Sequence, residues 1–214
     1  MACCHPLRAF PTGALTDKGK PCYFVTTHRL DYATADDFIK RGLPFKYLKV
    51  DDYIEIPCGH CVGCKQDAQR RWAFRLMAES LSHKYAYFVT LTYSDDPKSL
   101  SKRDLQLFHK RLRKVFPFRF FACGEYGEKN SRPHYHGIYF FDVPLEDLKL
   151  WSNKGSYKLF NSDTFTRVLG KGFVVLGTLT PSSCAYCAKY CLKQFDTPVG
   201  KEAPFILMSR AALS

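Results

Sequence analysis

The sequence predicts an α+β fold, with a central antiparallel β-sheet and flanking helices. Runs of β-branched and aromatic residues that end in turns alternate with segments whose apolar residues recur at helical spacing. In addition, 214 residues suffice for one domain with a sizeable core and a small appended module. We therefore expect an N-terminal wrapping segment over residues 1–66 and the core over residues 67–214.

The N-terminal part gives few periodic signals before the first helix. Residues 1–45 are punctuated by Pro, Gly and Thr, which predicts irregular structure, and a strand is expected at residues 47–56. Between residues 67 and 82, apolar residues recur at helical spacing, so we predict a helix there. The residues of its apolar face are Ala68, Trp72, Ala73, Leu76 and Met77.

A strand and a capped helix follow. Residues 85–93 are rich in β-branched and aromatic residues and stop at a turn, which predicts a strand. Ser101, with Asp104 three residues later, resembles a capping box in which Asp replaces the usual Glu or Gln. The helix that it opens ends at Pro117 and carries an apolar stripe of Leu105, Phe108, Leu112 and Val115.

The rest of the chain completes the sheet. The expected elements are strands at 118–125 and 133–140 joined by a turn, a short helix at 162–169, a strand at 172–180 and a helix at 181–195. From residue 85 the order is β-α-β-β-α-β-α, which a ferredoxin-like sheet satisfies.

Two histidines lie one residue apart in the strand predicted at 133–140. Side chains at i and i+2 of a strand leave the same face, so His134 and His136 can reach one metal ion. A divalent ion that activates a phosphate usually needs an oxygen ligand as well. Glu125 is placed beside the histidines if the two strands pair antiparallel, and Glu128, inside the turn, is the alternative. An isolated His-x-His pair is more often two imidazoles with ordinary hydrogen-bond partners, so the assignment depends on its combination with paired tyrosines.

Those tyrosines lie four residues apart in the last predicted helix, where Tyr186 and Tyr190 share a face. Lys189 and Lys193 each follow a tyrosine by three residues and could neutralise a phosphate or favour the phenolate. A free tyrosine has a pKa of about 10 and is a weak nucleophile, so catalysis needs a polarised phosphate. A metal beside paired tyrosines therefore indicates phosphodiester cleavage through a tyrosyl intermediate. An amphipathic helix with exposed tyrosines and lysines is the alternative.

Three cysteines, Cys58, Cys61 and Cys64, are spaced like metal ligands in a Gly-containing segment. They predict a structural Zn²⁺ site, and reduced cysteines in a tight turn are the alternative. In order of preference, the candidates for a fourth ligand are Cys3, His5, Cys4 and Cys22. A different set is expected to pack in the core of the last helix, because it forms an apolar stripe: Cys184, Cys187, Cys191 and Phe195.

The net charge of +12 and the pI of about 9.2 favour a polyanionic partner. Basic residues crowd one short segment, where a solvated helix face is the alternative: Lys102, Arg103, Lys110, Arg111, Arg113 and Lys114. The candidates for contacting DNA are Thr90, Thr92, Lys110, Arg113 and Arg132. No apolar run of about 18 residues and no signal peptide is evident, so we expect an intracellular protein with reduced cysteines and no membrane partner.

Five motifs resemble those of the rolling-circle replication initiators of gokushoviruses, single-stranded DNA phages of the microvirus group. They are Pro57–Cys64, Phe88–Tyr93, Cys123–Gly127, Arg132–Gly137 and Tyr186–Tyr190. These initiators are HUH endonucleases, named for a His-hydrophobic-His motif. The resemblance covers most of the chain and implies an HUH endonuclease core over residues 67–214.

It further implies Mg²⁺ or Mn²⁺ at the histidines, single-stranded origin DNA as substrate and a 5′-phosphotyrosyl intermediate. The place of action would be the host bacterial cytoplasm, with host helicase and polymerase as further partners. Tyr135 fills the hydrophobic position between the histidines, which is tolerable because its side chain points to the opposite face. Relatives are expected to continue beyond Arg210, which leaves DNA affinity and helicase recruitment open.

Two rival functions come from other classes. A non-catalytic, zinc-containing nucleic-acid-binding protein would keep the cysteines and the basic residues while the tyrosines are merely exposed. A non-haem iron oxygenase would use the two histidines and the carboxylate as its iron ligands. The positive charge and the paired tyrosines argue against the oxygenase.

Overall fold

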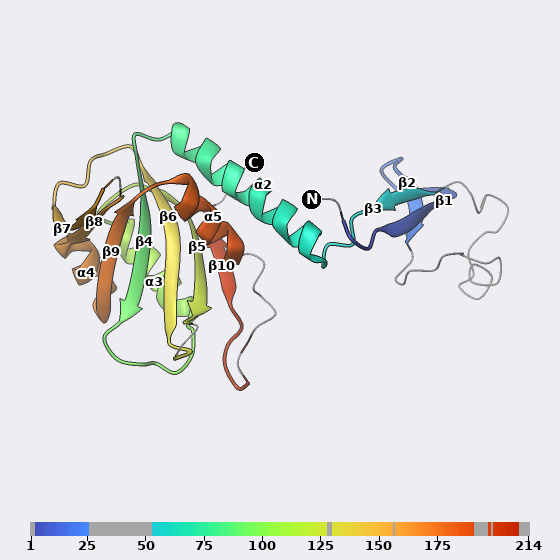
Figure 1. The fold of residues 1–214 in the computed structure, drawn as a ribbon. Coiled ribbons are helices and arrows are strands. Elements are labelled where there is room, and N and C mark those ends of the chain that lie inside the picture. Colours follow the sequence, from blue (N-terminus) through green and yellow to red (C-terminus); the bar gives the residue numbers. More distant parts are fainter. Residues whose placement is uncertain are drawn as a thin grey trace. The chain divides into compact units, whose positions relative to one another are not determined.

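The computed structural model describes residues 3–25, 53–127, 130–155, 157–190, 197 and 199–209 (Figure 1). The chain divides into two compact units, Met1–Asp67 and Ala68–Ser214. Among the described residues, no helix is both long and apolar enough to cross a membrane.

The first unit contains a three-stranded antiparallel sheet in the order β2-β1-β3. Its strands are β1 (Leu7–Leu15), β2 (Pro21–Val25) and β3 (Ile54–Ile56). The expectation of irregular structure is therefore wrong for β1 and β2. The pairing of β1 with β2 shifts register between Pro11 and Leu15, where Gly13 has a φ of 74°. This irregularity hides the strand from a search for alternation. Of the strand expected at 47–56, only Ile54–Ile56 is confirmed, because residues 47–52 lie outside the described ranges.

The helix predicted from Asp67 begins earlier, as α2 (Val62–Leu81). The amide N–H of Lys65 donates to the carbonyl of Cys61 at 3.0 Å, and the N–H of Cys64 donates to the Cys61 sulfur at 3.5 Å. Cys61 thus acts as the helix cap through its thiol. Because cysteine is not a usual capping residue, the sequence carries no start signal at this position.

The second unit is built on a seven-stranded antiparallel sheet in the order β10-β5-β6-β4-β9-β8-β7, which confirms the predicted α+β class. Its strands are β4 (Tyr85–Tyr93), β5 (Arg119–Tyr126), β6 (Pro133–Phe141), β7 (Leu148–Lys154), β8 (Tyr157–Ser162), β9 (Gly172–Thr178) and β10 (Phe205–Met208). Its further helices are α3 (Lys102–Leu112), α4 (Asp163–Leu169) and α5 (Pro181–Tyr190).

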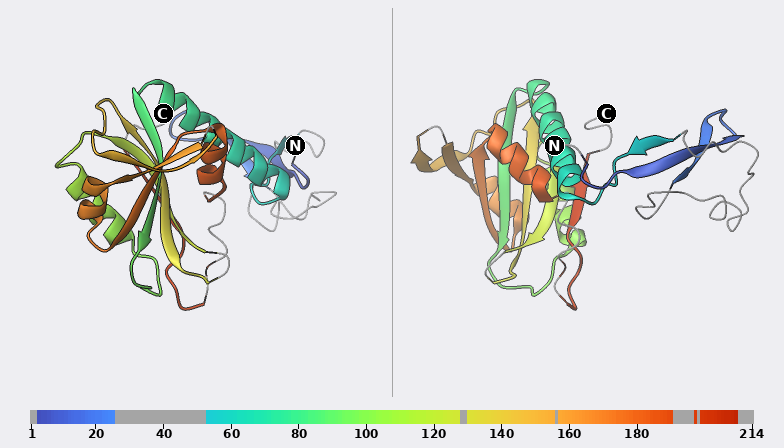
Figure 2. Two further views of the ribbon diagram at one scale, coloured as in Figure 1. Left: turned by 60° about the vertical axis from the view of Figure 1, so that its left-hand side comes forward. Right: turned by 45° about the vertical axis from the view of Figure 1, so that its right-hand side comes forward.

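Helices cover both faces of this sheet, α3 and α4 on one and α5 with the part of α2 from Ala68 onward on the other (Figure 2). Alternate residues of each strand supply the two cores. Val89 and Leu91 of β4 face α3 and α4, whereas Phe88 faces α2 and α5. The second core is the smaller one and consists of buried Leu76, Phe121, Ile138, Phe140, Cys184 and Cys187.

Three strands of this sheet are not predicted by the sequence analysis. The hairpin of β7 and β8 has a register shift between Leu150 and Ser152, which interrupts its alternation. β10 has only four residues, and it is a strand because it pairs with β5 far along the chain. Of the helix expected at 181–195, the structure describes α5 as far as Tyr190.

The register of the central strands confirms the predicted antiparallel pairing of β5 with β6. Glu125 is opposite His134, and Cys123 is opposite His136. On the other side of β6, Thr90 of β4 is opposite His136 and Thr92 is opposite His134. Residues that are far apart in the sequence are thereby brought to one end of one sheet face.

Candidate metal centre and tyrosine site

Glu125, His134 and His136 converge on one point of the sheet face covered by α2 and α5. The Nε2 atoms of His134 and His136 lie 2.9 and 2.8 Å from the same carboxylate oxygen, Oε1 of Glu125. The three ligand atoms all lie within 4.8 Å of one another. The predicted group is therefore assembled in space. Glu128, the alternative ligand, lies outside the described residues.

The second ring nitrogen of each histidine also has a partner. Nδ1 of His134 lies 3.0 Å from the carbonyl oxygen of Arg132, and Nδ1 of His136 lies 3.0 Å from the Thr90 hydroxyl. The carbonyl can only accept, so His134 donates from Nδ1 and leaves Nε2 available as an electron-pair donor. Such outer partners fix the tautomer and the ring orientation of metal-binding histidines. A further support is Phe88, which stacks on the His136 ring at 5.3 Å.

The charges of the group follow from its burial and its hydrogen bonds. Glu125 is only 5% exposed. Burial alone would raise its pKa, but hydrogen bonds to both imidazoles hold the pKa below its ordinary value. The pKa of His134 is raised, since its bond to Glu125 outweighs burial. The pKa of the more deeply buried His136 is lowered because burial dominates there. A charged carboxylate and a neutral imidazole are the states that bind a cation, so this donor set fits a divalent metal ion.

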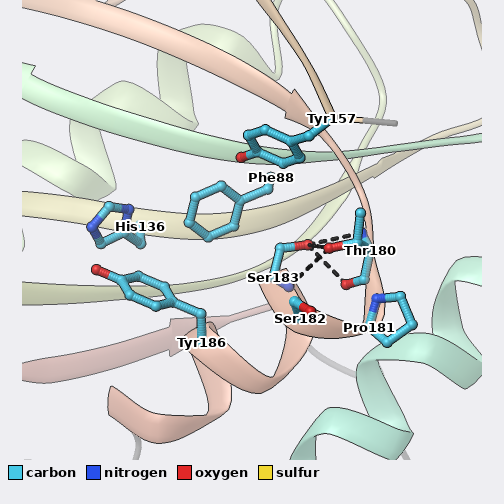
Figure 3. Close-up of a pocket in the computed structure, with 8 residues that line it drawn as sticks. All are labelled: Phe88, His136, Tyr157, Thr180, Pro181, Ser182, Ser183 and Tyr186. Carbon is cyan, nitrogen blue, oxygen red and sulfur yellow. Dashed lines mark hydrogen bonds between the residues drawn. The ribbon is translucent and has the colours of Figure 1, made fainter. Parts of the chain in front are cut away.

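Tyr186 reaches the same group from α5. Its hydroxyl lies 3.4 Å from Oε1 of Glu125. Its ring meets the rings of His136 and Phe88 edge-on, at 5.2 and 5.8 Å between centroids, and Figure 3 shows its hydroxyl directed towards His136. With 38% of its surface exposed, Tyr186 is accessible to a large substrate. The structure thus places a phenol beside the candidate metal ligands.

The other predicted members of this site are less completely described. Lys189 is exposed on α5. Tyr190 is the last residue of α5, and its side chain lies outside the described part of the structure, as does Lys193.

α5 is fixed on the sheet by its cap and by its apolar side. The hydroxyl of Thr180 accepts from the N–H of Ser183 at 3.1 Å, and the Ser183 hydroxyl accepts from the N–H of Thr180 at 2.8 Å. Cys184 and Cys187 are fully buried, which confirms their predicted role in the core. The side chain of Gln69 in α2 donates to the carbonyl of Ala185 at 2.9 Å. These contacts hold the Tyr186 ring in position.

A second group of ligands lies in the first unit. The sulfur atoms of Cys3, Cys58, Cys61 and Cys64 all lie within 4.8 Å of one another. The sulfurs of Cys61 and Cys3 are 3.7 Å apart, and those of Cys58 and Cys64 are 3.9 Å apart. A tetrahedral ion about 2.3 Å from each sulfur requires a separation of about 3.8 Å. Disulfide sulfurs would be about 2 Å apart, so this geometry is that of metal ligands.

Backbone N–H groups point at three of these sulfurs. Cys58 donates to Cys3 Sγ at 3.3 Å, Cys61 to Cys58 Sγ at 3.4 Å, and Cys4 to Cys61 Sγ at 3.3 Å. Such bonds favour the thiolate: they lower the pKa of Cys58 and lower that of Cys61 to about 5. Burial raises the pKa of the Cys64 thiol to about 12. Of the four candidates for the fourth ligand, Cys3 is the one that joins the cluster.

With both sites established, the comparisons with known proteins decide the family. The model of the replication-associated protein ORF2 family matches residues 86–195, just over half of the chain. The chain belongs to this family. The matched segment contains Glu125, both histidines and both tyrosines. The resemblance to phage replication initiators is thereby confirmed at the level of the family.

Curated relatives carry the same description. The replication-associated protein ORF2 of Spiroplasma virus 4 is 40% identical over 216 residues, covering 91% of this chain and 61% of the relative. The replication-associated protein VP4 of Bdellovibrio phage phiMH2K is 29% identical, covering 64% and 48% respectively. The replication-associated protein ORF4 of Chlamydia phage 1 is 28% identical, covering 65% and 38%. The chain thus spans between about two fifths and three fifths of these relatives. No solved structure matches significantly.

In this replication-associated protein, the predicted DNA contacts fall into two groups. Thr90 lies at the metal centre, where it bonds His136, and Thr92 is on the same strand face opposite His134. The Arg132 guanidinium donates to the carbonyls of Tyr93 and Ser94 at 2.5 and 3.1 Å.

The second group is on the other side of the sheet. Lys110 and Arg113 belong to α3 and its C-terminal cap, on the face opposite the metal centre. Arg113 stacks over the rings of Phe118 and Phe120. The structure therefore does not bring Lys110 and Arg113 together with the histidines.

Proposed function

We propose that this protein is a metal-dependent HUH-type DNA endonuclease and strand transferase, which nicks and rejoins single-stranded origin DNA for rolling-circle replication. The proposal rests on one observation above all. The Tyr186 hydroxyl lies 3.4 Å from the Glu125 oxygen on which both histidines converge. A nucleophile and a set of metal ligands can thus act on one phosphate.

Glu125, His134 and His136 would hold the ion. Carboxylate oxygen suits Mg²⁺ and Mn²⁺, and the two imidazole nitrogens favour Mn²⁺ over Mg²⁺. A bound ion would withdraw charge from the non-bridging oxygens of the scissile phosphate. Thr90 and the carbonyl of Arg132 keep both Nε2 atoms pointed at the ion position.

The reaction would use the phenol of Tyr186 as the nucleophile. As the bond from its oxygen to phosphorus forms, the phenol loses its proton. The bond from phosphorus to the 3′ oxygen breaks, and that oxygen takes up a proton to give a 3′-OH that primes synthesis. The product is a 5′-phosphotyrosyl link. Lys189, one turn away on α5, would neutralise phosphate charge, and Lys193 would do the same for the second tyrosine.

Tyr190, four residues after Tyr186, would act in the second half of the cycle. It cuts the regenerated origin, and the released 3′-OH attacks the first phosphotyrosyl link to close a circle. Two nucleophiles on one helix allow this alternation without dissociation of the enzyme.

A single strand at the metal centre would contact Thr92 and the surface around Arg132. To reach Lys110 and Arg113 on the opposite face, the DNA must pass around the edge of the sheet. We assign the contacts of host helicase and polymerase to the complete protein in the bacterial cytoplasm, since the relatives are longer than this chain.

The cysteine cluster would bind a structural Zn²⁺ through Cys3, Cys58, Cys61 and Cys64. Four thiolates suit Zn²⁺ and leave no open position for a substrate. The cluster also supports the alternative function, a zinc-containing nucleic-acid-binding protein without catalysis.

A covalent trap distinguishes the two functions. The protein is incubated with a pool of random single-stranded oligonucleotides and Mn²⁺, and the products are separated under denaturing conditions. Nicking predicts a protein–DNA adduct that needs the metal and survives in Tyr87→Phe, a tyrosine of β4 outside the site. The adduct should disappear in the Tyr186→Phe, Tyr190→Phe double variant. Binding without an adduct would instead establish the non-catalytic function.

A further inference from the structure

A pocket of about 720 Å³ adjoins the metal centre (Figure 3). It is comparable in volume to pockets that hold small organic ligands. Its lining comes from β4, β6, β8 and α5, with the connection from β9 to α5, and includes Phe88, His136, Tyr157, Thr180, Ser182 and Tyr186. None of these residues except His136 and Tyr186 has a role in the proposed reaction.

One wall of the pocket exists because Gly177 has no side chain. A Cβ atom at Gly177 would lie 2.6 Å from the Tyr157 hydroxyl and 3.0 Å from its ring carbon Cζ. Gly177 is paired with Phe88 across β9 and β4. The ring of Tyr157 therefore lies over Gly177 beside Phe88, and the two aromatic side chains line the pocket next to each other (Figure 3).

The chemistry of the lining suits a base better than a phosphate. The described lining contains no lysine, arginine, aspartate or glutamate. It offers aromatic rings, on which a nucleobase can stack, and hydroxyl groups. The hydroxyls of Thr180 and Ser183 bond each other at 3.3 Å within the helix cap. Those of Tyr157 and Ser182 are therefore the ones assigned to the edge of a base. Burial raises the pKa of Tyr157, so its hydroxyl remains a hydrogen-bond donor at neutral pH.

The position of the pocket determines which base can enter. His136 and Tyr186 belong both to the pocket wall and to the group that would act on the phosphate. A group that occupies the pocket is therefore attached directly to that phosphate.

We propose that this pocket binds the unpaired base of the nucleotide that adjoins the scissile phosphate. The inference rests on the proposed nicking function and adds a specificity site to it. A base held in a duplex cannot enter such a pocket without being extruded. The pocket would thus select single-stranded DNA and set a base preference at one position beside the nick.

Sequencing of the cleavage products tests this assignment. Wild-type protein is given a pool of random single-stranded oligonucleotides with Mn²⁺, and both the released fragments and the protein-linked DNA are sequenced. We expect a base preference at a position beside the nick. Tyr157→Ala should remove this preference and lower the adduct yield about tenfold, since one base–aromatic stack is lost. Tyr157→Phe should keep the yield and weaken only the choice among bases.

Tyr85→Ala is the matched control, because Tyr85 is an exposed tyrosine of β4 that does not line the pocket. It should cleave with the wild-type preference. A second measurement does not depend on the folding of a variant: an abasic nucleotide at the preferred position should slow wild-type cleavage about tenfold.

The possible failures are distinguishable. If wild-type protein forms no adduct, the proposed nicking function is wrong. If it forms adducts but no abasic position beside the nick slows it, or if folded Tyr157→Ala retains the preference, the pocket does not hold a base.

Discussion

The hydroxyl groups of Tyr93 and Tyr135 are hydrogen-bonded at 2.6 Å, on the sheet face opposite the histidines. Tyr135 stands between His134 and His136, so its contacts anchor the strand that carries both. Its hydroxyl also accepts from the N–H of Ser101 at 3.0 Å. Ser101 is the N-cap of α3. The residue between the two metal-binding positions thus joins β6 to β4 and to the start of a helix.

Tyr135→Phe should therefore destabilise the protein. The change removes a hydroxyl but leaves the Ser101 N–H and the Tyr93 hydroxyl in a buried setting, which typically costs about 1–3 kcal/mol. Urea unfolding followed by circular dichroism measures the loss. Tyr85→Phe, at an exposed position of β4, should change the free energy of unfolding by less than about 0.5 kcal/mol. Equal effects of the two substitutions would show that the Tyr93–Tyr135 contact has no net value.

Thr90→Val should weaken metal binding without removing a ligand. The Thr90 hydroxyl is bonded to Nδ1 of His136, and loss of such an outer contact typically costs about 10- to 100-fold in metal affinity. Titration with Mn²⁺ followed by electron paramagnetic resonance measures the dissociation constant. Thr92→Val makes the same chemical change on the same strand face and should leave the constant near that of the wild type. If both variants bind Mn²⁺ equally, Thr90 does not orient the ligand.

Sequence and structure agree where a local pattern specifies the answer. His134 and His136 share a face because strands alternate, and Glu125 joins them because a short turn fixes the pairing of β5 with β6. Tyr186 is placed by a helix whose buried Cys184 and Cys187 are visible as a stripe.

The features that were not predicted depend on distant partners. The contact between Thr90 and His136 joins strands separated by 46 residues. The pocket beside Tyr157 requires β8, which the sequence pattern does not reveal, and a glycine whose role appears only when Tyr157 is placed over it. The separation of Lys110 and Arg113 from the metal centre follows from the face that α3 covers.

The cysteine cluster should retain zinc through purification. Elemental analysis is expected to find about one zinc ion per chain. Cys61→Ser should lose most of this zinc, since it removes a sulfur that lies 3.7 Å from Cys3 Sγ and receives the N–H of Cys4. Cys22→Ser changes a cysteine outside the cluster and should retain the zinc. A wild-type protein that contains no zinc, or full zinc content in Cys61→Ser, would contradict the assignment.

His109 should make the stability of the second unit depend on pH. It is buried in α3, and its Nε2 lies 2.7 Å from the Tyr139 hydroxyl. Burial, with a smaller effect of the Arg113 charge, lowers its pKa to about 3. In the unfolded chain the pKa returns to about 6.5, so between pH 6.5 and 3 the unfolded state binds more protons. The contribution of His109 is therefore complete above pH 6.5 and is lost as the pH falls towards 3. Between pH 7.5 and 4.5 the loss should be on the order of 2 kcal/mol. Urea unfolding at both pH values, compared with His109→Gln, isolates it because groups common to both proteins cancel. The same acid sensitivity in His109→Gln would assign the effect to other groups.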